Sequence, residues 1–475
     1  MAEKKNLLFV FADQWRADAM GYANADPVMT PHMDAFCRDS TYCDHAFSTF
    51  PVCSPHRASL MTGKYPLSAG FFTNCKKGLS LRLGDDEICM GQILKDAGYQ
   101  TAYIGKWHLD EPEQNHCDAP ASGARDWDAF TPPGVRRHGF DYWYSYGTYD
   151  MHLSPHYWQD TPEMIKPGVW SVEHETDQAI EYIRKVRDPQ RPFAMCISWN
   201  PPHSVYSQVP QKYLDLYPQV RLKDNVGYTD IKQHTGERLN YTPEEMQLTT
   251  RQYYAAITGM DEQFGKLIEE LKRQGLYDDT VIVLSADHGD MMGSHGLMGK
   301  HVWYEESIRI PFVIHIPGNE KRYSSTCIGS QDMLPTLLSL LDVQIPDTVE
   351  GGDCSRYMTE DVEDPDRVSF LCACPGGYAV VQKFREAEKD PRKYGWRGVR
   401  TQDHTYVMEL GYDVTPKPVR YLYCIKTDPQ QLHPLDLEKP EHARLAAALE
   451  EKVMAWMGRQ KDGFAENWQA NSGNI

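Results

Sequence analysis

The chain has 475 residues, of which 41% are hydrophobic and 24% are charged, as in ordinary globular proteins. This length exceeds what one small hydrophobic core supports, so we expect two or three subdomains. The formal net charge of −18 argues against binding to nucleic acids or to anionic membrane surfaces. No apolar run approaches the roughly 18–20 residues that span a bilayer, so we predict no membrane insertion.

The N-terminus does not show the pattern of a secretion signal. The apolar run from Leu7 to Ala12 is short for a signal peptide, and no small-residue cleavage site follows it. We interpret the run as a buried first strand and expect a cytoplasmic protein, or a periplasmic or secreted one whose signal has been removed. Twelve cysteines are scattered without regular spacing, so we expect most of them to be reduced and buried. The sequence does not determine the oligomeric state.

Short apolar runs alternate with amphipathic segments from residue 6 to about 345. Continuous apolar runs of this length are typical of strands that are buried on both faces of a parallel sheet. The alternation predicts an α/β fold, with a large, mostly parallel sheet flanked by helices. The predicted strands are 7–11, 101–104, 192–199, 280–285 and 311–316, and the predicted helices are 87–98, 172–186, 243–275 and 331–341.

The pattern changes after about residue 366. Short strand-like segments lie close together along the chain, which favours antiparallel pairing, and a helical segment, His442–Met457, follows them. We predict a smaller C-terminal α+β subdomain with an antiparallel sheet and a final helix. The expected boundaries are 1–365 for the N-terminal domain and 366–475 for the C-terminal subdomain.

A cysteine stands where a helix begins, in the segment Cys-Ser-Pro-His-Arg at 53–57. Proline is favoured in the first turn of a helix, because its missing N–H would be unpaired there anyway. Cys53 is therefore expected near free backbone N–H groups and the positive end of the helix dipole, with Arg57 one turn further on. Such a place suits an anionic group. A small apolar residue packed under the helix start would explain the cysteine about as well.

Polar side chains directly follow four of the predicted strands. Each alone has an ordinary explanation as a helix cap, a solvated lysine or a core histidine bonded to the backbone. Together they are more informative, because the carboxyl ends of parallel strands converge on one edge of the sheet, where open α/β sheets bind ligands. These residues are Asp13, Gln14, Lys106, His108, His203, Asp287 and His288.

Together with Arg57 and Lys300, these residues form two chemical halves. Asp13, Gln14 and Asp287 supply hard oxygen ligands suited to Ca²⁺ or Mg²⁺. The softer nitrogen of His288 leaves Zn²⁺ or Mn²⁺ open. The other half carries cations or protons that would neutralise a sulfuryl or phosphoryl transition state, which predicts a hydrolase for tetrahedral anions. Its members are Arg57, Lys106, His108, His203 and Lys300.

These motifs, in this order, resemble those of the formylglycine-dependent sulfatases, a family of the alkaline-phosphatase-like superfamily. The resemblance covers residues 6 to about 345 and includes a later segment, 422–429, in the C-terminal subdomain. Within the family, the chain is most similar in appearance to bacterial carbohydrate sulfatases such as N-acetylglucosamine-6-O-sulfatases. The matching motifs are CSPHR at 53–57, GKWH at 105–108, PPH at 201–203, and SADHG at 285–289 with Lys300.

The resemblance implies that a maturation enzyme oxidises Cys53 to formylglycine (3-oxoalanine). The hydrate of this residue would attack the sulfur and form a covalent sulfo-enzyme before sulfate is expelled. The resemblance also implies one bound Ca²⁺ ion. Its ligands would be Asp13, Gln14, the modified Cys53, Asp287 and His288.

The remaining site residues would serve the same reaction. By the resemblance, Arg57 would orient the formylglycine, and Lys106 and Lys300 would bind the sulfate oxygens. His108 would assist the hydrate, and His203 would be the general acid near the leaving oxygen. A histidine suits that role because its pKa lies near neutrality.

Departures from the family motifs leave other functions open. Gln14 stands where many sulfatases have a second aspartate, and the pair Gln14/His288 also resembles phosphonate monoester hydrolases and related phosphodiesterases, which are the alternative function. His56 replaces the usual serine and Lys64 the arginine that often closes the motif, while C-x-P-x-R itself is intact. A third hypothesis is a sulfated-glycan-binding protein with an inactive site, which predicts that Cys53 stays a thiol.

The segment 110–168 is rich in proline, glycine, histidine and aromatic residues, and long loops in compact domains are usually functional. Aromatic rings beside charged side chains suit sugar faces and hydroxyls, but a packed aromatic loop core explains them about as well. The segment resembles that of bacterial carbohydrate sulfatases, which implies a sulfated saccharide substrate, for instance 6-O-sulfated N-acetylglucosamine of a glycosaminoglycan. The substrate-binding candidates are Arg137, His138, Asp150, His152 and His156.

Overall fold

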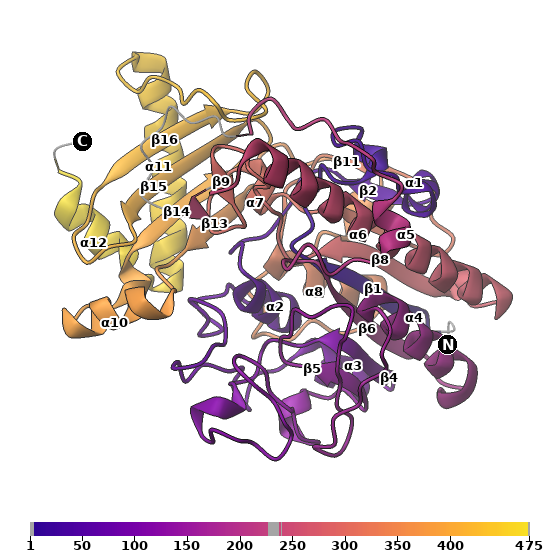
Figure 1. Cartoon of the computed structure of the whole chain (residues 1–475). Coiled ribbons are helices and arrows are strands. Elements are labelled where there is room, and N and C mark those ends of the chain that lie inside the picture. Colours follow the sequence, from indigo (N-terminus) through magenta and orange to yellow (C-terminus); the bar gives the residue numbers. More distant parts are fainter. Residues whose placement is uncertain (1–3, 227–236, 239, 474–475) are drawn as a thin grey trace.

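An eight-stranded sheet forms the centre of the computed structural model, which describes residues 4–226, 237, 238 and 240–473 (Figure 1). The five strands from β8 to β5 run parallel, whereas β10 is antiparallel to both of its neighbours. This arrangement confirms the predicted mostly parallel sheet. Across the sheet the strands are β11 (Tyr323–Ser324), β2 (Thr41–Cys43), β10 (Phe312–His315), β8 (Thr280–Ala286), β1 (Asn6–Asp13), β6 (Phe193–Pro202), β4 (Gln100–Lys106) and β5 (Tyr142–Tyr146).

Strand β1 lies in the middle of the parallel strands, where its unbroken apolar run is buried on both faces. Its register pairs Val10 with Ile197 of β6 and with Leu284 of β8. The three strands therefore end at nearly the same level, and the residues that follow them come together at one edge of the sheet.

Helices cover both faces of this sheet (Figure 1). One layer contains α1, α4 and the 31-residue helix α6, which begins with a capping box between Thr242 and Glu245. The other layer contains α2, α3 and α8. The helices of the N-terminal part are α1 (Pro31–Arg38), α2 (Cys53–Thr62), α3 (Met90–Asp96), α4 (Ser171–Glu181), α5 (Gln211–Leu214), α6 (Pro243–Arg273), α7 (Glu305–Ile308), α8 (Ser330–Leu340) and α9 (Ser355–Thr359).

A four-stranded antiparallel sheet forms the C-terminal part and confirms the predicted α+β arrangement. The predicted helix 442–457 lies within α11, and two helices that the sequence pattern did not reveal, α10 and α12, accompany it. The elements are β13 (Ser369–Ala373), α10 (Tyr378–Glu386), β14 (Gly395–Arg400), β15 (His404–Gly411), β16 (Val419–Cys424), α11 (Pro440–Gln460) and α12 (Phe464–Asn471).

The C-terminal sheet shares its hydrophobic core with the segment that leads into α2. Phe50 and Val52 pack in the same buried cluster as residues of β13 to β16 and α11. The backbone N–H of Cys372 donates to the carbonyl of Thr49 at 2.8 Å. Two small sheets complete the topology: β3 (Ala46–Phe47) with β12 (Ile328–Gly329), and β7 (Glu237–Arg238) with β9 (Leu297–Met298).

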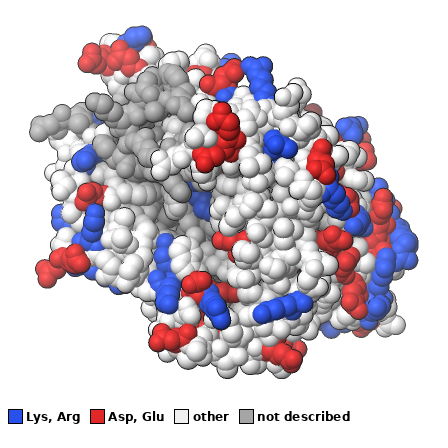
Figure 2. Space-filling view, in the orientation of Figure 1, with Lys and Arg blue, Asp and Glu red and all other residues white. Residues whose placement is uncertain are grey.

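The long segment 110–168 is more ordered than its weak periodicity predicted. Strand β5 lies within it and pairs with β4, and Tyr157 and Trp158 are completely buried beside it. On the surface, acidic and basic side chains are interspersed over the face in Figure 2. Among the described residues, no helix combines the length and the apolar character that crossing a membrane requires.

Candidate active site

The start of α2 places Cys53 at the edge of the sheet. Val52 is the extended N-cap residue, Cys53 is the first helical residue, and Pro55 lies in the first turn, as the sequence predicted. The helix ends at Gly63, whose φ of 67° is the left-handed conformation that glycine adopts easily. Cys53 is only 1% exposed, and the positive end of the helix is directed at the neighbouring strand ends.

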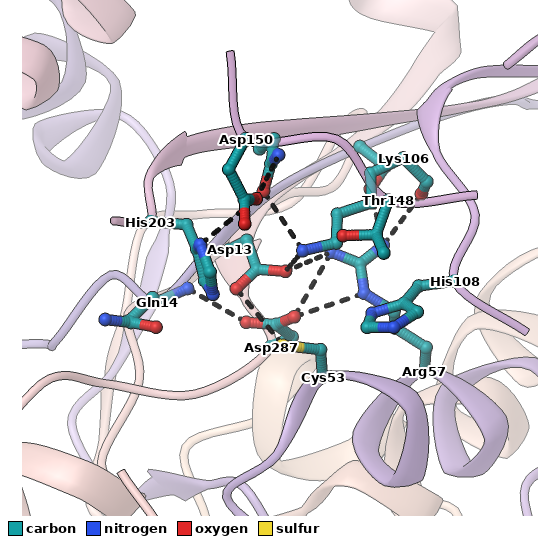
Figure 3. Close-up of polar contacts among 12 residues, drawn as sticks. Asp13, Gln14, Cys53, Arg57, Lys106, His108, Thr148, Asp150, His203 and Asp287 are labelled. Atoms are coloured by element: carbon teal, nitrogen blue, oxygen red, sulfur yellow. Dashed lines mark hydrogen bonds and ion pairs between the residues drawn. The ribbon is translucent and has the colours of Figure 1, made fainter. Parts of the chain in front are cut away.

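The strand ends meet around this cysteine (Figure 3). Asp13 ends β1 and Lys106 ends β4, while Asp287 directly follows β8 and His203 follows β6. In Figure 3, Arg57 and His108 lie on one side of Cys53, and Gln14 and His203 lie on the other. The convergence expected from a parallel sheet is therefore observed.

Four side chains form a compact cluster of metal-ligand type. Ligand atoms of Asp13, Cys53, Asp287 and His288 all lie within 4.8 Å of one another, and all four residues are buried. His288 Nδ1 lies 3.0 Å from the carbonyl oxygen of Gly289. Since a carbonyl only accepts, Nδ1 carries a proton, and Nε2 is the ring nitrogen directed at the cluster.

That nitrogen faces two carboxylates. His288 Nε2 lies 3.6 Å from Asp13 Oδ1 and 3.4 Å from Asp287 Oδ1. Burial and the charge of Asp13 raise the pKa of Asp287 to about 6, despite the opposing effects of His288 and Arg57. A divalent cation among these atoms would compensate the buried negative charge of the two carboxylates, so the donor set fits a metal ion.

Arg57 holds the two carboxylates in place. Its guanidinium lies 3.0 Å from Asp13 Oδ2 and 3.2 Å from Asp287 Oδ2. It also donates to the carbonyl of Lys106 at 2.8 Å and to the hydroxyl of Ser198 at 2.7 Å. All these partners are buried, so the planar fork of Arg57 determines the geometry of the cluster.

Gln14 is turned by an unusual backbone conformation. Its φ is 64°, and its N–H donates to Asp287 Oδ1 at 3.0 Å. The side-chain amide donates to Asp290 at 2.6 Å, and its oxygen accepts from Lys300 at 2.7 Å. The side chain thus links the carboxylate side of the site to its cationic side.

Two lysines border the position of the Cys53 sulfur. Lys300 Nζ lies 3.3 Å from Cys53 Sγ, and Lys106 Nζ lies 2.7 Å from Asp13 Oδ2. Although burial raises it, the pKa of Cys53 is held well below its ordinary value by Lys300, Lys106 and His288. The site therefore stabilises negative charge on the atom at the end of this side chain.

His108 presents an unprotonated nitrogen to the site. Its Nε2 lies 3.1 Å from the carbonyl oxygen of Cys75, so Nε2 carries the proton. Nδ1 is buried and has no hydrogen-bond partner among the described residues. Burial, assisted by the charges of Lys106 and Arg57, lowers the pKa of His108 despite its contact with Cys53. A neutral imidazole of this kind can accept a proton.

His203 has the opposite character. Its Nδ1 lies 2.5 Å from the carbonyl oxygen of Ser204 and 3.4 Å from Asp150 Oδ1. Burial and Lys300 lower its pKa, but the charges of Asp150 and Asp13 prevail and raise it to about 9. His203 is therefore protonated at neutral pH, and Nε2 has no hydrogen-bond partner among the described residues.

The substrate-binding candidates divide into two groups. Asp150 and His152 lie beside His203; Asp150 also accepts from Asn200 at 3.1 Å, and His152 Nε2 lies 3.1 Å from the carbonyl oxygen of His203. The other three candidates have partners within the loop segment 110–168 or directly before it. Arg137 pairs with Asp160, His156 with Asp128, and the ring of His138 lies near that of Trp107.

Several site neighbours were not singled out from the sequence. Asn74 lies 3.9 Å from Cys53 Sγ and accepts from the N–H of Ser54, 20 residues away along the chain. Asp290 accepts from Gln14 and from Tyr206. The position of Asn200, three residues before His203 at a strand end, was a signal that could have identified it.

Comparisons with known proteins agree with this geometry. The sulfatase family profile matches residues 5–343, and the profile for the N-sulphoglucosamine sulphohydrolase C-terminal region matches 293–459. The chain belongs to the sulfatase family, whose members generally use a formylglycine and a divalent metal, and it is a sulfuric ester hydrolase.

The chain is similar to several bacterial sulfatases. It is 33% identical to an endo-4-O-sulfatase of Bacteroides thetaiotaomicron, over 92% of this chain and 89% of that protein. It is 35% identical to an ulvan-active sulfatase of Formosa agariphila, over 97% and 82% of the two chains. An N-acetylglucosamine-6-O-sulfatase of B. thetaiotaomicron is 23% identical, over 97% and 87%. A Bacteroides fragilis structure described as a sulfatase superimposes with a TM-score of 0.84 and 33% identity, covering 98% and 97%.

Proposed function

We propose that this sulfatase removes sulfate from a sulfated carbohydrate and that the Cys53 side chain, oxidised to formylglycine, supplies the oxygen nucleophile. The observation that carries the proposal is the position of Cys53, whose sulfur contacts Asp13 and His288 at 3.5 and 3.3 Å and Lys300 at 3.3 Å. A nucleophile between metal-type ligands and cations suits attack on an anionic ester.

We assign the metal site to Asp13, Asp287, His288 and the modified Cys53, with Ca²⁺ as the expected ion. Two carboxylates and a hydrate oxygen are hard ligands, which favours Ca²⁺ over softer metals. The bound ion would polarise the ester oxygens and lower the pKa of the nucleophile. We keep Gln14 as a further proposed ligand of this ion; its N–H also holds the carboxylate of Asp287, and its side-chain oxygen accepts from Lys300.

The cationic residues would neutralise the negative charge of the sulfuryl group. Lys106 and Lys300 are positioned to bind its oxygens, and Arg57 keeps the carboxylates and the helix start in register. His108, neutral and with a free nitrogen, would take the proton that leaves the nucleophile.

His203 would protonate the leaving oxygen of the sugar. Its raised pKa keeps the proton available at neutral pH, and the ion pair with Asp150 fixes the ring so that Nε2 remains free to donate. Asp150 is partly exposed, so the same carboxylate can also meet hydroxyl groups of a bound sugar. His152 would stabilise this pair, because its Nε2 contacts the backbone carbonyl of His203.

The proposed substrate class rests on the relatives. Proteins that resemble this chain are named for 4-O-sulfated, 6-O-sulfated and ulvan substrates, so the class is sulfated polysaccharides or their fragments. Our specific hypothesis is 6-O-sulfated N-acetylglucosamine, with the 4-O-sulfated hexosamine as the first comparison. We further propose that residues 1–365 hold the catalytic centre and that 366–475 support it.

The test is sulfate release from a panel of sulfated mono- and disaccharides by protein co-expressed with a formylglycine-generating enzyme. Mass spectrometry of the Cys53 peptide should show the loss of mass that accompanies conversion of thiol to aldehyde. Turnover of aryl sulfates or phosphodiesters alone would contradict the carbohydrate proposal and favour the phosphonate monoester hydrolase alternative. A Cys53 that stays a thiol in the native host would favour a binding protein.

The metal assignment has its own test. Removal of divalent ions with a chelator should lower activity by at least about a hundredfold, because one side of the nucleophile then loses its charge support. Readdition of Ca²⁺ should restore more activity than Zn²⁺ does. Restoration by Zn²⁺ alone would contradict the assignment of Ca²⁺.

A further inference from the structure

A buried lysine next to the active site has no acidic partner. Lys76 is 7% exposed, and its Nζ donates to the carbonyl of Gly376 at 2.7 Å. Among the described residues, no carboxylate lies within ion-pair distance of this ammonium group. An ammonium group has three donors, and burying its charge with a carbonyl and an aromatic ring as partners leaves it without a counter-ion.

Lys76 belongs to the segment that contacts the reacting residue. Asn74, two residues earlier, lies 3.9 Å from Cys53 Sγ. Burial lowers the pKa of Lys76 to about 8, with Cys53 opposing this shift and Lys300 contributing to it. Lys76 is therefore within electrostatic reach of the catalytic centre. Its burial is comparable to that of Lys300, which is 9% exposed.

An exposed aromatic ring lies beside the ammonium group. Lys76 Nζ is 5.2 Å from the ring centroid of Trp127, and this tryptophan is 42% exposed. The next residue, Asp128, accepts from the N–H groups of Gly147 and Thr148 at 2.8 and 3.1 Å. Thr148 is drawn among the active-site residues in Figure 3, so Asp128 links the chain that carries Trp127 to that site. Exposed aromatic faces stack on sugar rings.

The residue after Lys300 adds a polar atom without a partner. His301 Nδ1 is buried and makes no hydrogen bond with the described residues. Burial and the charges of Lys300 and Lys76 lower the pKa of His301 to about 3, so the imidazole is neutral. A neutral imidazole nitrogen can bond to a hydroxyl group.

A structural role for Lys76 is the alternative. Its bond to Gly376 links the segment after α2 to the C-terminal part, and Thr73 donates to the same carbonyl at 3.0 Å. That link needs only one donor and no charge. It does not account for a cation that is buried without an anion.

We propose that Lys76, with Trp127 and His301, forms a subsite that binds a second anionic group, a carboxylate or a second sulfate, on the saccharide whose sulfate ester is hydrolysed. The inference rests on the proposed function and narrows the substrate to a dianionic saccharide. Trp127 faces the sugar ring, and Lys76 supplies the charge that selects the second anion.

The test compares matched substrates with the matured enzyme. One pair is a uronyl-hexosamine disaccharide sulfated on the hexosamine and its uronate methyl ester; the other is a disulfated and a monosulfated hexosamine. We expect kcat/KM to favour the dianionic member of one pair by about 10- to 100-fold, the worth of a charge-assisted hydrogen bond. The first pair identifies a carboxylate and the second a sulfate.

Variants then test whether Lys76 causes the preference for the dianionic substrate. Lys76→Gln, which can still donate to Gly376, should reduce the ratio within the preferred pair to about threefold or less, and Lys76→Arg should retain part of it. Lys77→Gln is the matched control, because Lys77 is the adjacent exposed lysine and contacts Gln114. A wild-type ratio near one, or equal losses on both members in Lys76→Gln, would overturn the subsite.

Inhibition separates this inference from the proposed function. Glucuronate or glucosamine 2-N-sulfate is added during hydrolysis of 4-nitrophenyl sulfate, with N-acetylglucosamine as the neutral reference. Inhibition that depends on Lys76, without cleavage of any saccharide, would support the subsite and contradict the carbohydrate proposal. Cleavage of saccharides without any preference dependent on Lys76 would contradict the subsite alone.

Discussion

Two groups of charged side chains in this protein differ in how they are paired, one at the strand ends and one, the loop group, in the segment 128–160. In the loop group each charge has its own partner: Arg137 pairs with Asp160, and His156 with Asp128. At the strand ends the charges are shared, and Asp13 alone contacts Arg57, Lys106 and Cys53.

The difference in pairing distinguishes residues that stabilise the fold from residues that are arranged to act on a ligand. A charge with a single dedicated partner is satisfied within the fold and leaves nothing to act on a substrate. Charges that several groups share around a cysteine are arranged for a ligand, and they shift the pKa values of their neighbours. The same contrast exists between thiols: burial raises the pKa of Cys196 to about 12, whereas the pKa of Cys53 is well below its ordinary value.

The largest expected effect comes from removing the proposed nucleophile. Cys53→Ala should lower sulfate hydrolysis by at least about 10⁴-fold, because no other group can accept the sulfuryl transfer. Sulfate release and the thermal midpoint would be measured together. Cys196→Ala, in strand β6, is the control and should remain active; equal loss in both variants would remove the distinction between the two thiols.

A second comparison uses two buried arginines. Arg57→Lys should lower kcat/KM by about 10²–10³-fold, because an ammonium group cannot contact Asp13, Asp287 and Ser198 at once. Arg137→Lys, in the loop group, should change kcat/KM by less than about threefold. If the two variants lost equal activity, Arg137 would belong to the site.

The third prediction concerns pH. In Asp150→Asn, the pKa of His203 should fall from about 9 towards or below its ordinary 6.5, since burial and Lys300 then act unopposed by this carboxylate. The proton donor is lost as pH rises through its pKa, so the basic limb of kcat should move about 1–3 units to lower pH. A pH–rate profile on one sulfated sugar checks this. An unchanged basic limb would show that another group is the acid.

The smallest effect on activity is expected in the loop group. His156→Asn would leave Asp128 with a poorer partner and should lower the free energy of unfolding by about 1–3 kcal/mol. The thermal midpoint should fall while kcat changes by at most about threefold. Loss of sugar turnover with an unchanged midpoint would instead identify His156 as a substrate contact.

The strand ends could be predicted because their signals are local. An apolar run followed by Asp13 or by Asp287 defines both the strand and the edge where it ends, and parallel topology brings the two together. The helix start at Cys53 could likewise be predicted from Pro55, since proline is favoured in the first turn of a helix.

Other features depend on contacts between distant segments. The ion pair of Asp150 with His203 joins a loop to a strand end, so His203 could be proposed as the acid but its raised pKa could not be foreseen. The left-handed φ of Gln14, which turns its side chain towards Lys300, has no signature in the residue type. Strand β5 was hidden because its aromatic run shows no alternation.

The bond between Cys372 and Thr49 has a consequence for biosynthesis. The segment 49–52, which leads to Cys53, packs in part against strand β13, and about 320 residues separate Cys53 from Cys372. A ribosome needs roughly 15–60 s to add that many residues at about 5–20 per second. During this interval the segment 49–52 lacks this part of its packing, so the chain next to Cys53 would stay accessible to the enzyme proposed to oxidise it. The distance along the chain would thus set the time available for the proposed modification of Cys53, and the synthesis of strand β13 would end this period.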